Sequence, residues 1–287
     1  MLEQVSHYVW SLLGERVILP FVLWSVLGGL VVLFGIRAMR WNSEVLKSAG
    51  LNIGLMVFNS VFIVATAFAI EWVQVWFTSL NMPTVPVEVW QGVWPIWPIL
   101  AAIFLIDFVN YWHHRLMHTK WYWPVHAVHH ADRHMNFTTL FRIHFLEGIA
   151  MKLAAIFFMS WLQVPAEAYA IAAVINMLVG QYIHLDIPIS HGKFGDKIIA
   201  SPQVHRWHHA NAPEAFGKNL ANFFSCIDVV FGTYYNPGPC KAPLGITPDP
   251  GQGLPANLML PFTEWKRILD ESRAGAEPMA ETSTASV

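Results

Sequence analysis

Long uncharged stretches dominate the first part of the chain and predict membrane-crossing helices. Val17–Ile36 and Ser48–Ile70 contain no charged residue over 20 and 23 positions. Trp72–Val87 adds apolar sequence after Glu71, and Val89–Ile106 is a further uncharged run. Because a helix needs about 20 apolar residues to cross the hydrocarbon core, these runs are near spanning length. They predict an all-α, polytopic membrane protein with four to five apolar helices.

Two shorter apolar runs follow, Leu153–Ala166 and Ala168–Ile183, separated by Glu167 and close to Pro165. They predict a tight helical hairpin at about residues 148–184. The hairpin either crosses the membrane or enters it and returns, and a buried hairpin of a soluble domain is the alternative.

The composition supports a membrane protein and excludes several other classes. Charged residues make up 13% of the 287 positions and hydrophobic residues 55%, whereas an ordinary soluble chain has about 25% charged residues. So few charges do not cover a water-exposed surface, and so many apolar residues exclude disorder. The net charge of −2 without a long basic block excludes nucleic-acid binding, and two Cys are too few for a disulfide scaffold.

The distribution of Lys and Arg predicts the orientation and the domains. Of the 17, only Arg16 precedes the first apolar run, and none lies between Glu71 and Ile106. An outside N-terminus therefore places the rest on the cytoplasmic side. The acidic start of the chain argues against a cleaved signal peptide, and in a reducing cytoplasm Cys226 and Cys240 are expected to be free thiols. The predicted regions are transmembrane at 1–106, catalytic at 107–235 and cytoplasmic at 236–287, with a disordered tail after about Asp270.

Histidines are the unusual feature, since 13 of the 14 fall between His113 and His209. Residues at i, i+3 and i+4 share a helix face, so one H-x3-H and two H-x2-H-H clusters each project imidazoles in one direction. Packing imidazoles together has no structural benefit unless a metal binds their nitrogens. Eight or nine nitrogens suit two metals with positions left open. The predicted ligands are His114, His118, His126, His129, His130, His184, His205, His208 and His209.

The other histidines are predicted to have no metal-binding role. His113 points away from the face of His114 and His118, while His134, His144 and His191 have no clustered partner. Ligating histidines usually donate their second N–H to a carboxylate or carbonyl, and Asp107 lies seven residues before His114 on the same helix face. The predicted supporting residues are Asp107, Asn110, Tyr111, Arg142, Glu147, Asn222 and Asp228, with Asp186 as a further candidate.

Several motifs between Asp107 and Tyr234 resemble the fatty acid hydroxylase/sterol desaturase superfamily. Asp107–His118, His126–His130 and Ser201–His209 resemble its three histidine boxes. Asn136–Glu147 resembles the R-x-H-P-x-E segment with Phe145 in place of Pro. Residues 219–234 resemble the closing N-x-G…W-D-x-L-F-G-T-Y block with Phe and Ile in place of Gly and Trp.

This resemblance implies a membrane enzyme with two iron ions, which uses O2 to hydroxylate or desaturate an unactivated C–H bond of a lipid. The spacing within the first box is closer to sterol desaturase members, so a sterol-like substrate is favoured, ahead of fatty-acyl, ether-lipid and carotenoid substrates. Without a cytochrome b5-like segment, electrons are expected from a separate ferredoxin- or cytochrome b5-type donor with its reductase. A bacterial inner membrane is favoured over the endoplasmic reticulum.

Two other classes remain as alternatives. A zinc hydrolase would normally contain H-E-x-x-H, and this string is absent. A metal transporter would have its ligands near the middle of the spans, whereas the clusters here follow the predicted helix ends.

Overall fold

The chain is helical throughout the part described by the computed structural model, which covers residues 15–67, 69–91, 93–94 and 96–274. Within these residues no strand forms, and extended backbone pairs only in an isolated bridge between Ala210 and Leu244. The predicted all-α class is confirmed.

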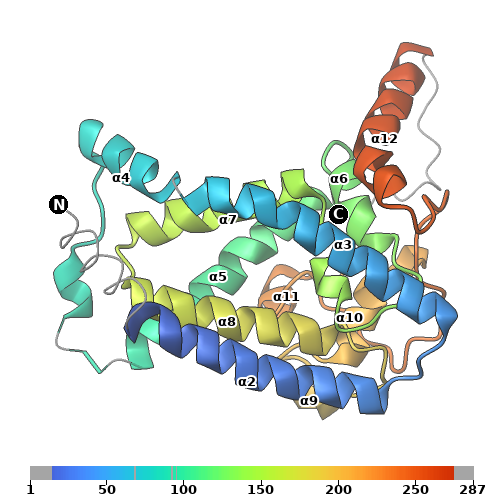
Figure 1. Cartoon of the computed structure of the whole chain (residues 1–287), viewed down its shortest axis with the longest axis horizontal. Helices are drawn as coiled ribbons and strands as arrows, with labels where there is room; N and C mark the ends of the chain where they lie inside the picture. Colours follow the sequence, from blue (N-terminus) through green and yellow to red (C-terminus); the bar gives the residue numbers. More distant parts are fainter. Residues whose placement is uncertain (1–14, 68, 92, 95, 275–287) are drawn as a thin grey trace.

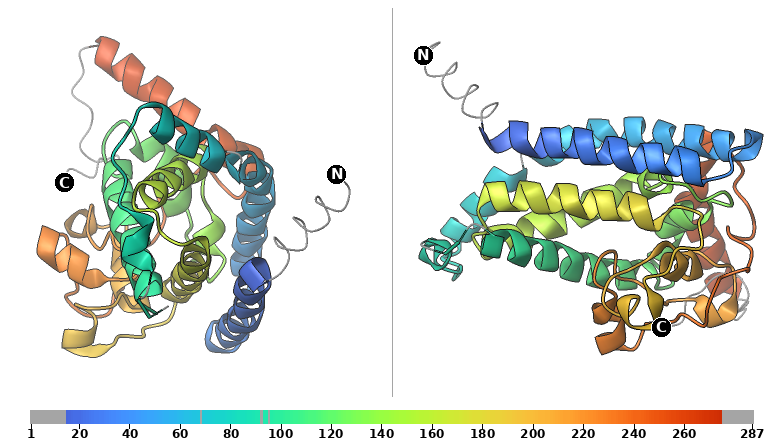
Figure 2. Two further views of the ribbon diagram at one scale, coloured as in Figure 1. Left: turned by 90° about the vertical axis from the view of Figure 1, so that its left-hand side faces the viewer. Right: turned by 90° about the horizontal axis from the view of Figure 1, so that it is seen from below.

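Five long helices run along one another and form the body of the molecule (Figures 1 and 2). These are α2 (Glu15–Ala38), α3 (Ser43–Ala67), α5 (Ile96–Met117), α7 (Phe145–Trp161) and α8 (Ala166–Ile183). A shorter helix, α4 (Ala69–Ser79), follows α3 and packs on α7. The central helix α5 packs on both α7 and α8.

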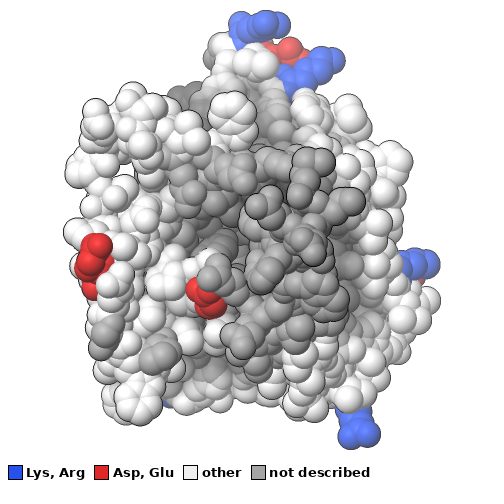
Figure 3. Space-filling view, turned by 60° about the vertical axis from the view of Figure 1, so that its left-hand side comes forward, with Lys and Arg blue, Asp and Glu red and all other residues white. Residues whose placement is uncertain are grey.

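Among the described residues, three helices are long and apolar enough to cross a membrane: Ser43–Phe62 within α3, Ile96–Met117 and Ala166–Ile183. Ser25–Ala38 of α2 is a shorter apolar helix. An 18-residue helix is about 27 Å long, close to the thickness of the hydrocarbon core. In the face shown in Figure 3, outside the residues drawn grey, Lys and Arg appear only at the margins. The predicted polytopic membrane architecture is confirmed.

The helix that carries the first histidine motif begins and ends later than predicted. The separate 3-10 helix η1 (Val87–Trp90) occupies the start of the predicted Val89–Ile106 span, and α5 begins at Ile96 and ends at Met117. Pro98 lies in the first turn of α5, where a missing N–H costs little. Asp107 and Tyr111 are fully buried, so polar residues here face the protein and do not end the helix. The predicted boundary after Ile106 therefore falls inside one continuous helix.

The predicted hairpin exists, but it is not tight. Its arms α7 and α8 are joined by the short turn 162–165. Both arms pack on α5, and their other neighbours differ. The first arm packs on α3, α4 and α5, and the second on α2 and α5. The two arms thereby leave room between them for the cavity described below.

Short helices gather at one end of the long helices and form a cap (Figure 2). They are α6 (Trp123–His130), η2 (Thr139–Phe141), α9 (Gly192–Gly195), α10 (Pro202–His208), η3 (Pro213–Ala215) and α11 (Ser225–Phe231). The last helix, α12 (Leu254–Ala274), packs on α6 and lies crosswise to the long helices (Figure 1). The predicted disordered tail is wrong up to Ala274, because α12 continues to this residue, and the rest of the tail lies outside the described residues.

Candidate metal centre

Histidines from four separate segments converge where the long helices meet the cap. They come from the end of α5, from α6, from the C-terminus of α8 and from α10. Their ring nitrogens form two groups, and within each group the nitrogens lie within 4.8 Å of one another. The first group is His114, His118, His126, His130 and His208; the second is His129, His184, His205 and His209. These are the nine histidines that the sequence predicts as ligands.

Each of the two H-x2-H-H helices supplies both groups. On α6, His126 and His130 are one turn apart and enter the first group, whereas His129 enters the second. On α10 and its C-cap the order reverses: His205 and His209 enter the second group, and His208 enters the first. Residues i+3 and i+4 lie on the same helix face as residue i but on opposite sides of it. The spacing of the motif therefore suits a helix that bridges two adjacent centres.

The inner ring nitrogens approach one another as closely as hydrogen-bonded atoms. The Nε2 atoms of His114 and His126 are 2.9 Å apart, and those of His184 and His205 are 3.0 Å apart. Both ring nitrogens of His118 and Nε2 of His208 are buried without a hydrogen-bond partner. Buried polar atoms without partners are costly, and a cation between the rings would satisfy them. The residues present therefore fit a pair of metal ions.

Burial keeps these imidazoles in the neutral form that binds metals. Desolvation lowers the pKa of His184 and of His208 to about 4, despite the carbonyl oxygen that each ring contacts. The pKa values of His118, His130 and His209 are lowered well below the usual range, again mainly by burial. At neutral pH no proton competes with a metal for their inner nitrogens.

Main-chain carbonyls orient four of the rings through the outer nitrogen. The Nδ1–H groups of His114, His184 and His208 donate to the carbonyl oxygens of Leu220, Gly180 and Lys218 at 2.7, 2.6 and 2.8 Å. His129 donates in the same way to the carbonyl of Arg142 at 3.2 Å. These bonds place the proton on Nδ1 and leave Nε2 free to face the centre. Carbonyl acceptors have no side-chain signal, so the sequence does not predict them.

Glu147 is the predicted supporting residue whose side chain contacts a ligand ring. His126 donates its Nδ1–H to Oε1 of Glu147 at 2.8 Å, and both side chains are buried. The Arg142 side chain instead donates from Nε to the Val128 carbonyl and from Nη2 to Asn257, which ties α12 to the site.

The predicted role of Asp107 is wrong in its geometry. Its carboxylate contacts no ligand ring and accepts the main-chain N–H groups of Asn222, Phe223 and Phe224 at 3.0, 3.0 and 2.6 Å. Asp228 similarly accepts the N–H groups of Leu220 and Ala221. The two carboxylates thus fix the loop whose Leu220 carbonyl orients His114. The position of Asp107 on a helix face does not reveal this role, because the N–H groups that donate to its carboxylate belong to a loop more than 100 residues further along the chain.

The remaining predicted residues lie near the centre without touching the ligand rings through their side chains. The hydroxyl of Tyr111 bonds to Thr233 and accepts from Arg115, Asn222 bonds to Asn176, and Asp186 pairs with Arg206 at the surface. Asn110 lines the cavity. The histidines left out of the prediction are also outside both groups: His144 caps α7, His191 bonds to Tyr182, and His113 lines the cavity.

A large apolar cavity of about 560 Å³ reaches the histidines from the side of the long helices. Its walls come from α3, α5, α7 and α8, and six histidines close its inner end: His113, His114, His126, His129, His184 and His205. A cavity of this size suits a small organic ligand or part of a lipid.

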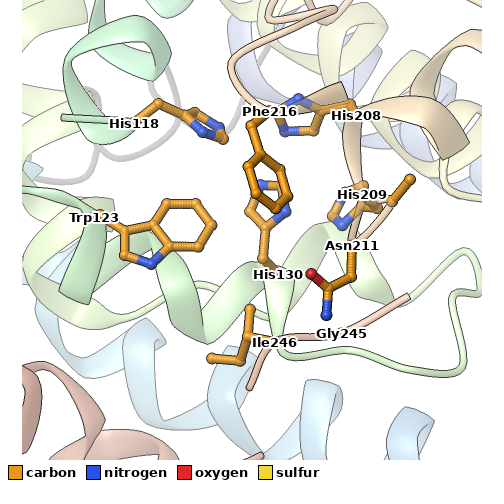
Figure 4. Close-up of a pocket in the computed structure, with 10 residues that line it drawn as sticks. His118, Trp123, His130, His208, His209, Asn211, Phe216, Gly245 and Ile246 are labelled. Atoms are coloured by element: carbon orange, nitrogen blue, oxygen red, sulfur yellow. The ribbon is translucent and has the colours of Figure 1, made fainter. Parts of the chain in front are cut away.

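A second opening reaches the first histidine group from the cap. It has room for about one water molecule, with a volume of about 20 Å³. Figure 4 shows His118, His130, His208 and His209 around this opening together with Trp123 and Phe216. The centre is therefore approached by a large apolar space on one side and by a small passage on the other.

We expect Glu147→Ala to weaken metal binding by about 10- to 100-fold, as losses of a hydrogen bond to a ligand histidine do. Without the carboxylate, His126 loses the bond that fixes its ring orientation. Competition with a chelator for bound metal measures the change. Glu214→Ala, at an exposed position of the cap, is the control and should keep the wild-type affinity; equal affinities in both variants would mean that Glu147 does not orient His126.

Comparison with known proteins gives consistent matches across this region. The family model described as fatty acid hydroxylase matches residues 99–233. The ornithine lipid hydroxylase OlsE of Rhizobium tropici is 25% identical over 61% of this chain and 53% of its own length. Alkylglycerol monooxygenase is 27% identical in Xenopus tropicalis and 28% in Homo sapiens, over 50% and 48% of this chain and 31% of each relative.

The alignments thus cover about half or less of the length of these relatives, and no solved structure matches the chain. The matched segment contains the end of α5, both histidine groups and the helices α7 and α8. Over residues 99–233 the chain is therefore similar to the fatty acid hydroxylase family, and the relatives it matches are lipid-hydroxylating enzymes by name.

Proposed function

We propose that this protein is a membrane di-iron oxygenase that hydroxylates a lipid with O2. The observation that carries the proposal is the junction of two imidazole groups with the inner end of an apolar cavity. An alkyl C–H bond has no acidic proton and offers nothing for a side chain to attack, so its oxidation needs a metal cofactor. The family match and the names of the relatives support the same reaction class.

Under this proposal each histidine group holds one iron ion. Imidazole is a common ligand of iron, and five and four donors leave positions open at both ions. When bound, the iron pair would supply electrons to O2 and so make the oxidation of a C–H bond possible. The carbonyls that accept from Nδ1, together with Glu147, hold the rings in place before the metal binds. The apolar walls align the alkyl part of the substrate and keep water from the reacting carbon.

The finer substrate assignment is part of this proposal. The relatives are named for ornithine lipids and alkylglycerols, which supports hydroxylation of a lipid with a polar head. The sterol-like substrate favoured from the first-box spacing and the alternative of desaturation remain predictions, as do a separate electron donor and a cytoplasmic site at a bacterial inner membrane.

Metal content and oxygen consumption together test this proposal. The purified protein should contain about two iron ions per chain and consume O2 only when lipid and a reducing system are present, with a hydroxylated lipid as product. Zinc with ester or peptide hydrolysis would favour a hydrolase. Metal flux into vesicles without oxygen consumption would favour a transporter. Either result would overturn the proposal.

Gly148 provides an independent test of the cavity. This residue lies on α7 and lines the cavity, and an added Cβ would meet no atom within 4 Å. We expect Gly148→Phe to fill the cavity and lower lipid turnover at least about tenfold, since misplacing a substrate by about 1 Å already costs 10²-fold. Iron content should not change.

The matched control is Gly54→Phe, because Gly54 on α3 also has open space around its Cα and does not line the cavity. Product analysis by mass spectrometry and metal analysis measure the two properties. Full turnover by Gly148→Phe would show that the substrate does not occupy this cavity.

A further inference from the structure

One cation lies on the wall of the apolar cavity. Lys152 is in the middle of α7, is half-buried and lines the cavity. Gly148, one turn earlier on the same helix, also lines the cavity and has open space where a side chain would be. Among the described residues Lys152 has no carboxylate partner and no side-chain hydrogen bond. Ionisable residues at membrane depth are costly and mark functional sites.

Four residues that line the cavity also carry a buried polar side-chain atom without a hydrogen-bond partner. Oδ1 of Asn59, Nδ2 of Asn176, Nε2 of His113 and Oε2 of Glu147 are buried without a hydrogen-bond partner, and all four residues line the cavity. A hydrocarbon chain beside these atoms would leave every one of them unpaired, which is unfavourable for buried polar atoms. The polar atoms therefore fit a ligand that has hydrogen-bonding groups as well as an alkyl part.

We propose that Lys152 binds an anionic group of the lipid substrate, a carboxylate or a phosphate, inside the cavity. This inference rests on the proposed function and adds the polarity and position of the substrate. Lys152 follows Glu147, which contacts His126, by five residues, or about 7.5 Å along the helix axis. The Cα–Cβ bonds of a helix tilt toward its N-terminus, and on α7 this direction leads back to the histidines. The oxidised carbon accordingly lies close to the polar head of the lipid and far from the end of its alkyl chain.

Binding of two probes with the same chain and different heads tests the inference. Hexadecanesulfonate carries a permanent negative charge and hexadecanol carries none. With the full-length protein in nanodiscs of neutral lipid, we expect Lys152→Met to weaken hexadecanesulfonate binding by about 10-fold or more, since a hydrogen bond to a charged group contributes about 1.5–3 kcal/mol. Hexadecanol binding should be unchanged, and Lys152→Arg should keep the preference for the anion.

Lys193→Met is the matched control, because Lys193 is exposed and lies outside the cavity; it should bind both probes as the wild type does. Competition by palmitate and by hexadecyl phosphate then distinguishes a carboxylate from a phosphate head. Equal affinities of the wild type and Lys152→Met for hexadecanesulfonate would overturn the inference and leave Lys152 as a side chain that only reaches toward the membrane surface. Thermal unfolding is measured for Lys152→Met and for Lys152→Gln, a second uncharged variant, to establish that both fold.

The same measurements separate this inference from the proposed function. Binding is measured before and after removal of metal with a chelator, so it does not depend on turnover. Equal hexadecanesulfonate binding by the wild type and Lys152→Met, with intact iron content and oxygen consumption, contradicts only the role of Lys152. Anion binding in a protein without iron or oxygen consumption contradicts only the oxygenase.

Discussion

Replacing one histidine in either group is expected to remove about one metal ion and all lipid turnover. His118→Ala takes a donor from the first group, and His209→Ala takes one from the second. Both rings are buried and have unpartnered nitrogens, so each substitution removes a nitrogen that is placed to bind a metal ion. Because the proposed reaction needs both ions, loss of either one should stop product formation, although the remaining group can still hold its own ion.

Metal analysis of the purified variants and product analysis measure this outcome. His134→Ala is the matched control, since His134 belongs to neither group, and it should keep the metal content and the turnover of the wild type. His118→Ala and His209→Ala should both still insert into the membrane, because α3, α5 and α8 are unchanged as spans. Wild-type activity in His118→Ala and His209→Ala would refute the assignment of the ligands.

Asp107→Ala is expected to lower the stability of the protein by several kcal/mol. The substitution leaves three main-chain N–H groups, those of residues 222–224, without their acceptor, and each buried group without a partner costs about 1–3 kcal/mol. The loop also carries the Leu220 carbonyl that orients His114. We therefore expect metal affinity to fall as well, by about 10- to 100-fold.

Thermal unfolding and metal retention of Asp107→Ala check the two effects. Asp107→Asn keeps one acceptor oxygen and should have an intermediate stability. Asp186→Ala removes a surface carboxylate paired with Arg206, and exposed pairs contribute about 0–1 kcal/mol, so this variant should unfold near the wild-type temperature. Unchanged unfolding and metal retention in Asp107→Ala would show that the loop holds its shape without this carboxylate.

The fold class follows from the sequence because membrane spans depend on a local property, the absence of charge over about 20 residues. Helix ends are less accessible, since they depend on what surrounds each polar residue. Asp107 lies inside α5 and not at its end, because loop N–H groups far along the chain satisfy its carboxylate. Helix α12 was not predicted, because packing on α6 and the Arg142–Asn257 bond stabilise it.

Eight of the nine histidines are predictable for the same reason that the spans are, since their spacing on a helix is a local pattern. Their division into two groups is not local. His129 follows His126 by three residues but lies in the other group, because the end of α5 contributes its histidines to the first group and the end of α8 contributes His184 to the second. His184 has no neighbouring histidine in sequence, and only the position of α8 brings it to His129 and His205.

The continuity of α5 bears on which lipid carbon the proposed oxygenase would attack. One helix crosses the membrane and presents His114 in its last turn, without a hinge between the two parts. The depth of the metal centre relative to the lipid head groups is therefore a fixed length, set by the number of residues in α5. A thicker or thinner bilayer shifts lipid carbons along this length, so membrane composition is expected to change the position of oxidation as well as its rate.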